Sequence, residues 1–171
     1  MPDIIKFILT IVLLIAAGVL LWYGYDEHGR EWLENNFSVT ETTVYIESVP
    51  LTARVADTPD ERAQGLSGVS DLEDLEVMLF VFPESDRYGI WMKDMRMPLD
   101  IIWVSQDLKI VHIEENVSPS TYPGTTFYPP EPAKYVIEGN AFLAESINAN
   151  VGDPVTIPAR FTDTTFTNLQ N

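Results

Sequence analysis

The longest uncharged apolar run of the chain lies near its N-terminus, over residues 7–23. A helix that crosses a bilayer needs about 20 apolar residues. Residues 4–23 supply that length if the ammonium group of Lys6 reaches back to the lipid headgroups. Trp22 falls where an interfacial aromatic belt is expected. The pattern predicts a transmembrane anchor, residues 1–25, that contacts the membrane through residues 4–23.

The charges that flank this run predict its orientation. Lys6 and the N-terminal amine precede it, whereas Asp26 and Glu27 follow it, with Arg30 as a single nearby cation. The positive-inside rule then places the N-terminus in the cytoplasm and the rest of the chain outside it. The alternative is a cleaved signal peptide and a secreted domain. Small residues occur at 16–18, but they lie inside the apolar run, which favours a retained anchor.

Past the anchor, the polar and apolar pattern divides the chain into three parts. Residues 26–43 are polar and acidic and predict a juxtamembrane spacer. Residues 44–158 alternate short apolar runs with turn signals and predict a globular domain, and residues 159–171 predict a loose polar tail. The strands expected in the domain are residues 44–56 with a break at Pro50, 77–82 as a central buried strand, 88–93, a hairpin of 99–104 and 108–117, 134–138, and 154–157.

Two short helices are expected beside these strands. Thr58 can cap a helix that Pro59 begins and Gly65 ends, because Glu61 completes a capping box. Asn140 is the expected cap of a second helix that runs to residue 148. The predicted fold class is therefore α+β: a compact β-rich domain, with a twisted antiparallel or barrel-like sheet and two short helices, after one N-terminal transmembrane helix.

Residues 118–132 contain five of the twelve prolines and predict a long irregular loop. Loops of this length in compact domains are often functional. The loop is expected to be either a rim over a pocket or a plain surface crossover, and the sequence leaves both readings open.

Composition narrows the partners that the chain can have. The net charge is −16, with 26 acidic and 10 basic side chains, which argues against nucleic acid because phosphate contacts need clustered cations. The absence of cysteine excludes thiol catalysis and disulfides. The histidines, His28 and His112, are too far apart for metal-ligand spacing. We therefore expect no nucleic acid, no metal site and no cofactor, and the oligomeric state is left open.

Several consecutive motifs resemble a known family. They are Glu61 to Leu66, Met78 to Phe82, Trp91 to Asp94, Met97 to Ile101, Tyr135 to Gly139, and Gly152-Asp153. In this order and spacing they are similar to the family called domain of unknown function 192, over about residues 51–157. The resemblance implies a compact β-rich domain, often behind a signal or anchor segment, and no established reaction. The family usually has asparagine where this chain has Asp94.

Charged and aromatic residues of the domain form a candidate ligand-binding set: Arg62, Trp91, Lys93, Asp94, Asp100, Trp103 and Glu138. Buried carboxylates near a lysine have shifted pKa values and can do acid–base work. Tryptophans beside carboxylates suit sugar recognition, since the ring stacks while the carboxylates accept hydrogen bonds from hydroxyls. The competing interpretation is structural: a Lys93–Asp94 pair at a strand end, Asp100 bonded to its own turn, and both tryptophans in the core.

Three functions are compatible with these residues. The first is a membrane-anchored extracytoplasmic domain that binds a small polar or carbohydrate-like ligand, or a partner in the cell envelope. The second is a carbohydrate-active hydrolase that uses two of Asp94, Asp100 and Glu138, which requires two carboxylates across an open cleft. The third is a structural accessory without a ligand. Whether the domain is an enzyme is therefore a question for its three-dimensional structure.

Overall fold

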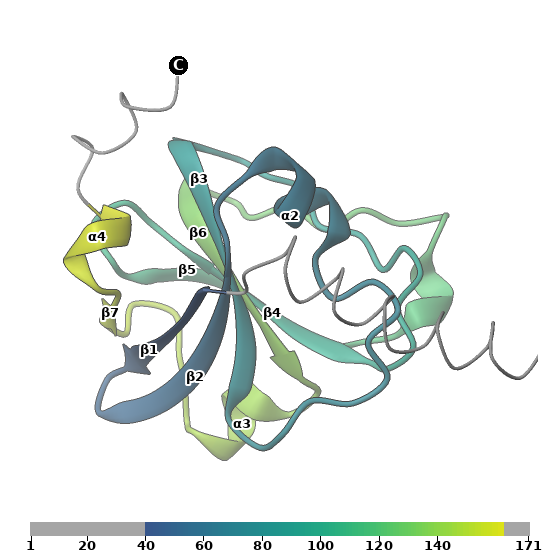
Figure 1. Cartoon of the computed structure of the whole chain (residues 1–171), viewed down its shortest axis with the longest axis horizontal. Helices are drawn as coiled ribbons and strands as arrows, with labels where there is room; N and C mark the ends of the chain where they lie inside the picture. The colour runs from purple at the N-terminus through teal and green to yellow at the C-terminus, as the bar shows by residue number, and fades with distance from the viewer. Residues whose placement is uncertain (1–39, 163–171) are drawn as a thin grey trace, which may run out of the picture. The chain divides into compact units, whose positions relative to one another are not determined.

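The structure, a computed structural model, describes residues 40–162 (Figure 1). The predicted transmembrane anchor, most of the predicted spacer and residues 163–171 of the predicted tail lie outside this range. Across residues 40–162, no helix is both long enough and apolar enough to span a membrane.

Seven strands form one curled sheet in the order β5-β4-β6-β3-β2-β1-β7 (Figure 1). Their bounds are β1 Thr40–Ile46, β2 Val49–Ala56, β3 Glu76–Asp86, β4 Leu99–Val104, β5 Ile110–Val117, β6 Ala133–Asn140 and β7 Val155–Thr156. Neighbouring strands are antiparallel except β2 and β3, which are parallel because the chain crosses over between them. The predicted compact β-rich domain is confirmed.

Backbone hydrogen bonds also link the two ends of the sheet. The amide of Ile110 donates to the carbonyl oxygen of Asp153 at 3.0 Å, and the amide of Val155 donates to that of Leu108 at 2.9 Å. These bonds bring the start of β5 beside β7. The curl of the sheet is the result of the ordinary right-handed twist accumulated over seven strands.

The helices are short: α2 Pro59–Gln64, the 3₁₀ turn η1 Pro119–Thr121, α3 Leu143–Ser146 and α4 Ala159–Thr162. The predicted capping box of α2 is confirmed. The hydroxyl of Thr58 accepts from the amide of Glu61 at 3.3 Å, and the Glu61 carboxylate accepts from the Thr58 amide at 3.0 Å. Because this box sets where α2 begins, it also sets which side chains α2 presents to the sheet.

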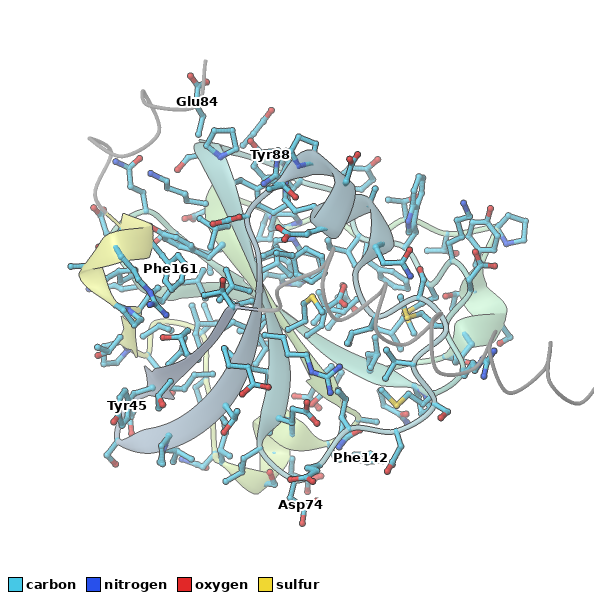
Figure 2. All side chains as sticks on the ribbon, in the orientation of Figure 1. Tyr45, Asp74, Glu84, Tyr88, Phe142 and Phe161 are labelled. Carbon is cyan, nitrogen blue, oxygen red and sulfur yellow. The ribbon has the colours of Figure 1, made fainter. Side chains whose placement is uncertain are left out.

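The two faces of the sheet bury different sets of side chains. Along β6, Tyr135 and Ile137 belong to a first cluster, and Val136 belongs to a second. The first cluster also includes Leu143 of α3, and Phe161 of α4 packs against it (Figure 2). The second cluster lies under α2 and the segment that follows it, and includes Leu66, Leu72, Phe80, Ile90, Met92 and Trp103.

Two predicted details of the first hairpin are wrong. The turn lies at Glu47 and Ser48, where Glu47 has φ 53°, and not at Pro50, which is inside β2 opposite Tyr45. Pro50 is tolerated because β2 pairs with β3 only from Thr52 onward, so its missing N–H leaves that ladder intact. In addition, β1 begins at Thr40, inside the predicted spacer.

Three further predicted elements are corrected by the structure. Residues 88–93 are not a strand, because only Ile90 makes a β-bridge. Asn140 does not cap a helix: it ends β6 and its side-chain amide donates to the Leu72 carbonyl at 3.0 Å, while α3 begins at Leu143. The first residues of the predicted loose tail form α4.

Candidate functional site

A pocket of about 200 Å³ opens over the second cluster. Its walls come from residues 62–65 and Ser67 around α2, Phe80 and Phe82 of β3, residues 89–91, Met95, and Glu138 of β6. Three of the predicted site residues therefore meet here, namely Arg62, Trp91 and Glu138.

Glu138 is the most unusual of these residues. It is only 3% exposed, and β6 holds it between Met78 of β3 and Ile101 of β4. Its Oε2 atom is buried and has no hydrogen-bond partner among residues 40–162. Burial disfavours the charged form, so the pKa of the Glu138 carboxyl is raised from 4.5 to about 8. Glu138 is therefore protonated at neutral pH and has an unused hydrogen-bonding atom.

Arg62 is held at the pocket wall by the backbone and by an aromatic ring. Its Nη1 atom donates to the carbonyl oxygen of Val81 at 2.9 Å and to that of Asp57. The guanidinium lies 5.3 Å from the centre of the Phe82 ring, which stacks on Tyr88 beside α2 with centroids 3.6 Å apart (Figure 2). Burial lowers the pKa of Arg62, although the group stays cationic at any physiological pH.

Trp91 lines the pocket, and the proline-rich loop packs against Trp91 from outside the wall. Trp91 is 53% exposed and meets the ring of Tyr122 edge to face, with centroids 6.5 Å apart. The loop is tied down because Ile90 and Phe127 exchange two backbone hydrogen bonds, of 2.9 and 2.8 Å. Gly89 permits this contact, since a Cβ atom there would lie 2.5 Å from the Tyr128 ring. The loop therefore lies beside the pocket rim.

Lys93 and Asp94 lie outside the pocket wall. They form an exposed turn in which Asp94 has φ 57°. Their backbone carbonyl oxygens accept hydrogen bonds from the Ser67 hydroxyl, at 3.1 Å, and from the Gly68 amide, at 2.9 Å. Because Ser67 lines the pocket, this turn helps to fix the pocket wall through its backbone.

Asp100 has a structural position on the other face of the sheet. It is fully buried, and its carboxyl oxygens accept from the amides of Asn116 at 2.8 Å, Phe142 at 3.0 Å and Ala144 at 2.9 Å. The last two amides begin α3, whose own N-cap residue makes no side-chain hydrogen bond. Asp100 therefore caps α3 from β4, a role that the sequence could not reveal because the two segments are distant in the chain.

Asp94, Asp100 and Glu138 do not share a pocket, because Glu138 is the one of the three that lines it. In the register between β4 and β6, Ile101 lies opposite Glu138, whereas Asp100 lies opposite Gly139. Side chains alternate between the faces of a sheet, so Asp100 and Glu138 point to opposite faces.

Trp103 belongs to the core. It is fully buried in the second cluster, its Nε1 atom donates to the carbonyl oxygen of Tyr88 at 3.0 Å, and its ring lies 5.4 Å from that of His112. Across residues 40–162, no three His, Asp or Glu side chains are grouped so that they could hold a metal ion.

The sequence profile of one family, DUF192, described as Uncharacterized ACR, matches residues 41–157. The chain belongs to the DUF192 family. No curated protein matches the chain. Two solved structures are similar to it. A protein of Sinorhizobium meliloti 1021, described as a candidate transcription regulator, is 28% identical with a TM-score of 0.65, and the match covers 69% of this chain and 94% of that one. A protein of unknown function from Novosphingobium aromaticivorans DSM 12444 is 30% identical with a TM-score of 0.64, and the match covers 68% of this chain and 85% of that one.

The pocket of this DUF192 domain is lined by residues from four of the motifs that carry the family resemblance. Met78 to Phe82 contributes Phe80 and Phe82, and Trp91 to Asp94 contributes Trp91. Glu61 to Leu66 forms most of α2 and the turn after it, and Tyr135 to Gly139 forms most of β6. The predicted ligand-binding set did not include the remaining wall residues, namely Ala63, Gln64, Gly65, Ser67, Phe80, Phe82, Gly89, Ile90 and Met95. The alternation of Phe80 and Phe82 along β3 indicates a shared face, but nothing in the sequence pairs that face with α2.

Proposed function

We propose that this DUF192 domain is a binding module that holds a small polar ligand in the pocket around Glu138. The observation that carries the proposal is the unpartnered carboxyl oxygen of Glu138, buried in a pocket wall. An unpaired buried polar atom costs about 1–3 kcal/mol, and a ligand that hydrogen-bonds to it recovers that free energy. Binding pockets of small molecules typically combine apolar walls with a few such polar groups.

The wall composition favours binding over hydrolysis. A glycosidase of the usual kind needs two carboxyl groups that flank the scissile bond. Among the residues that line this pocket, Glu138 is the one with a carboxyl group, and Asp100 is on the other face of the sheet. A purely structural accessory would have no need of an open cavity with an exposed tryptophan, Trp91, at its mouth.

The transcription role in the description of the S. meliloti protein is not part of this proposal. The net charge of −16 would repel the phosphate backbone of nucleic acids. A sugar remains within the proposed ligand class, because the exposed ring of Trp91 offers a stacking surface beside a hydrogen-bonding group.

Blocking the pocket mouth tests the proposal. Ala63 is an exposed residue of α2 that lines the pocket, so Ala63→Trp is expected to fill the mouth with little effect on stability. In a thermal-shift screen of the full-length protein against sugars, carboxylates, amines and amides, at least one compound should raise the melting temperature of the wild type. That shift should disappear in Ala63→Trp.

The control is Asp60→Trp, which places the same ring on α2 away from the pocket. It should keep the ligand-induced shift. A screen in which no compound class stabilises the wild type, or in which Ala63→Trp responds as the wild type does, would contradict the proposal.

We further propose that residues 4–23 anchor the domain outside the cytoplasmic membrane, since the apolar run is long enough to span a bilayer and the acidic residues follow it. After cell breakage and high-speed centrifugation, the full-length chain should sediment with membranes, and a variant without residues 4–23 should stay in the supernatant. A full-length chain that keeps its N-terminus and stays in the supernatant would refute the anchor.

A further inference from the structure

The polar side chains of the pocket wall include both hydrogen-bond donors and hydrogen-bond acceptors. The side-chain amide of Gln64 donates to the carbonyl oxygen of Ser67 at 3.1 Å, and the Ser67 hydroxyl donates to that of Lys93, also at 3.1 Å. These bonds hold both side chains in place, and each side chain keeps an oxygen atom that can accept from a ligand. Arg62 adds a guanidinium group, which has further N–H donors besides those on Nη1.

This mixture favours hydroxyl groups over charged head groups. A hydroxyl both donates and accepts, whereas a carboxylate only accepts and an ammonium group only donates. Glu138 is neutral at pH 7 because burial raises its pKa to about 8. Among the described wall residues, Arg62 is then the one that carries a charge, and backbone carbonyl oxygens already bind its Nη1 atom. A ligand with several hydroxyl groups, such as a sugar, uses the donors and the acceptors together.

The pocket is too small to enclose a large ligand. Its volume is about 200 Å³, below the range of about 300–1,000 Å³ that is usual for ligand pockets. That space suits one sugar ring, and a second ring would lie outside the wall. Trp91 lines the pocket and is nevertheless 53% exposed, so its side chain reaches from the wall to the solvent. A second ring can therefore lie against Trp91.

Trp91 and Tyr122 form an exposed aromatic pair beside the pocket. Their ring centroids are 6.5 Å apart and their planes differ by 76°, so the rings do not stack on each other. Tyr122 is 40% exposed and is outside the pocket wall. The loop that carries Tyr122 is fixed because Ile90 and Phe127 exchange two backbone hydrogen bonds. The pair is therefore a preformed apolar surface next to the pocket.

We propose that the natural ligand is a neutral glycan of at least two sugar units, with one unit in the pocket and the next unit against the Trp91–Tyr122 pair. This inference rests on the proposed function, because it specifies the ligand of the same pocket. The apolar face of a sugar ring packs on an aromatic ring, while the hydroxyls at its edge bind polar groups. The net charge of −16 favours a neutral glycan over an acidic one.

Two other chain-like ligands suit this surface less well. Single-stranded nucleic acid also stacks on aromatic rings, but it needs a positively charged groove, and this chain is strongly acidic. An extended peptide that adds a strand needs free backbone groups at a sheet edge. The amide and carbonyl of Ile90 are instead bonded to Phe127, at 2.9 and 2.8 Å. A glycan that packs on the rings needs neither feature.

The dependence of affinity on glycan length tests this inference. The probes are cello-, malto- and chito-oligosaccharides of one, two and four units, and isothermal titration of the full-length protein measures their affinities. In at least one series, the disaccharide should bind about tenfold more tightly than the monosaccharide, because its second unit reaches the aromatic pair.

Three variants locate the second unit. Tyr122→Ala should abolish the advantage of the disaccharide and leave the affinity for the monosaccharide unchanged, whereas Trp91→Ala should weaken both sugars. Tyr45→Ala is the matched control and should behave as the wild type, since Tyr45 is also 40% exposed but lies on β1, outside the pocket wall. The informative quantity is the ratio of the two affinities within one variant. Partial unfolding lowers both affinities by the same factor and leaves this ratio unchanged.

The outcomes separate this inference from the proposed function. Equal affinity for monosaccharide and disaccharide in every series, with binding lost in Ala63→Trp, would overturn the glycan inference and leave the binding function standing. A disaccharide advantage that persists in Tyr122→Ala would overturn it as well, as would tighter binding of tetra-alanine or tetrathymidylate than of any glycan. If no sugar bound at millimolar concentration, the inference would fail, and the wider thermal-shift screen would then decide the binding function.

Discussion

Replacing Asp100 by alanine is expected to destabilise the domain by roughly 3–5 kcal/mol, one of the two largest effects predicted for this chain. The reason is that one fully buried carboxyl group accepts from the backbone amides of Asn116, Phe142 and Ala144. Alanine would leave all three without an acceptor, and would uncap α3, whose N-cap residue supplies no side-chain hydrogen bond. Urea unfolding of the full-length chain measures the loss.

Two further variants make the measurement interpretable. Asp107→Ala removes an exposed carboxyl group from the turn between β4 and β5 and should change stability by less than about 0.5 kcal/mol. Asp100→Asn keeps one acceptor oxygen but turns an NH₂ group toward an amide donor, so it should fall between wild type and Asp100→Ala. If Asp100→Ala were as stable as Asp107→Ala, the proposed capping role would be wrong.

The free energy of unfolding is expected to decrease as the pH rises, and the Glu138→Gln variant should lose much of this pH dependence. The pKa of Glu138 is 4.5 in an exposed chain and about 8 in the folded domain. Below pH 4.5, Glu138 is protonated in both the folded and the unfolded state, so its contribution to the free energy of unfolding does not change with pH. Between the two values the folded state holds a proton that the unfolded state releases, so the free energy of unfolding falls by about 1.4 kcal/mol per pH unit. Above about pH 8, Glu138 is ionised in both states, and the free energy of unfolding stops decreasing on its account.

This difference can be measured by chemical unfolding at several pH values from about 5 to about 9. Other groups titrate in the same range, so the informative quantity is wild type minus Glu138→Gln. Glu145→Gln, an exposed carboxyl group on α3, serves as the matched control and should follow the wild type. Parallel curves for wild type and Glu138→Gln would mean that Glu138 is not buried as described.

The local elements of the fold are readable from the sequence because their causes are local. The capping box at Thr58 depends on residues three positions apart, and it is present as predicted. The apolar run of β3 predicts a buried central strand, and β3 lies between β2 and β6. The segment 88–93 was less predictable, because its backbone partner, Phe127, lies in a loop distant in the sequence.

The sequence predicts the site only in part, because several of its contacts join segments that are distant in the chain. Trp91 and Glu138 stand out as an aromatic and a charged residue in apolar surroundings, and the fold brings them to one pocket with Arg62, which lies in a polar stretch of the sequence. The position of Asp100 depends on the register between β4 and β6, where a shift of one residue exchanges the two faces. Its three amide donors come from separate segments, so no spacing rule could identify them.

The place of β6 in the sheet has a consequence for how the chain is made. β6 is the strand that joins the β4–β5 hairpin to β3, and its residues come near the end of the domain. During synthesis from the N-terminus, the β1–β2–β3 group and the hairpin therefore emerge first as two separate sheets with exposed apolar faces. The two pieces cannot join into one sheet until β6, which ends at Asn140, has left the ribosome.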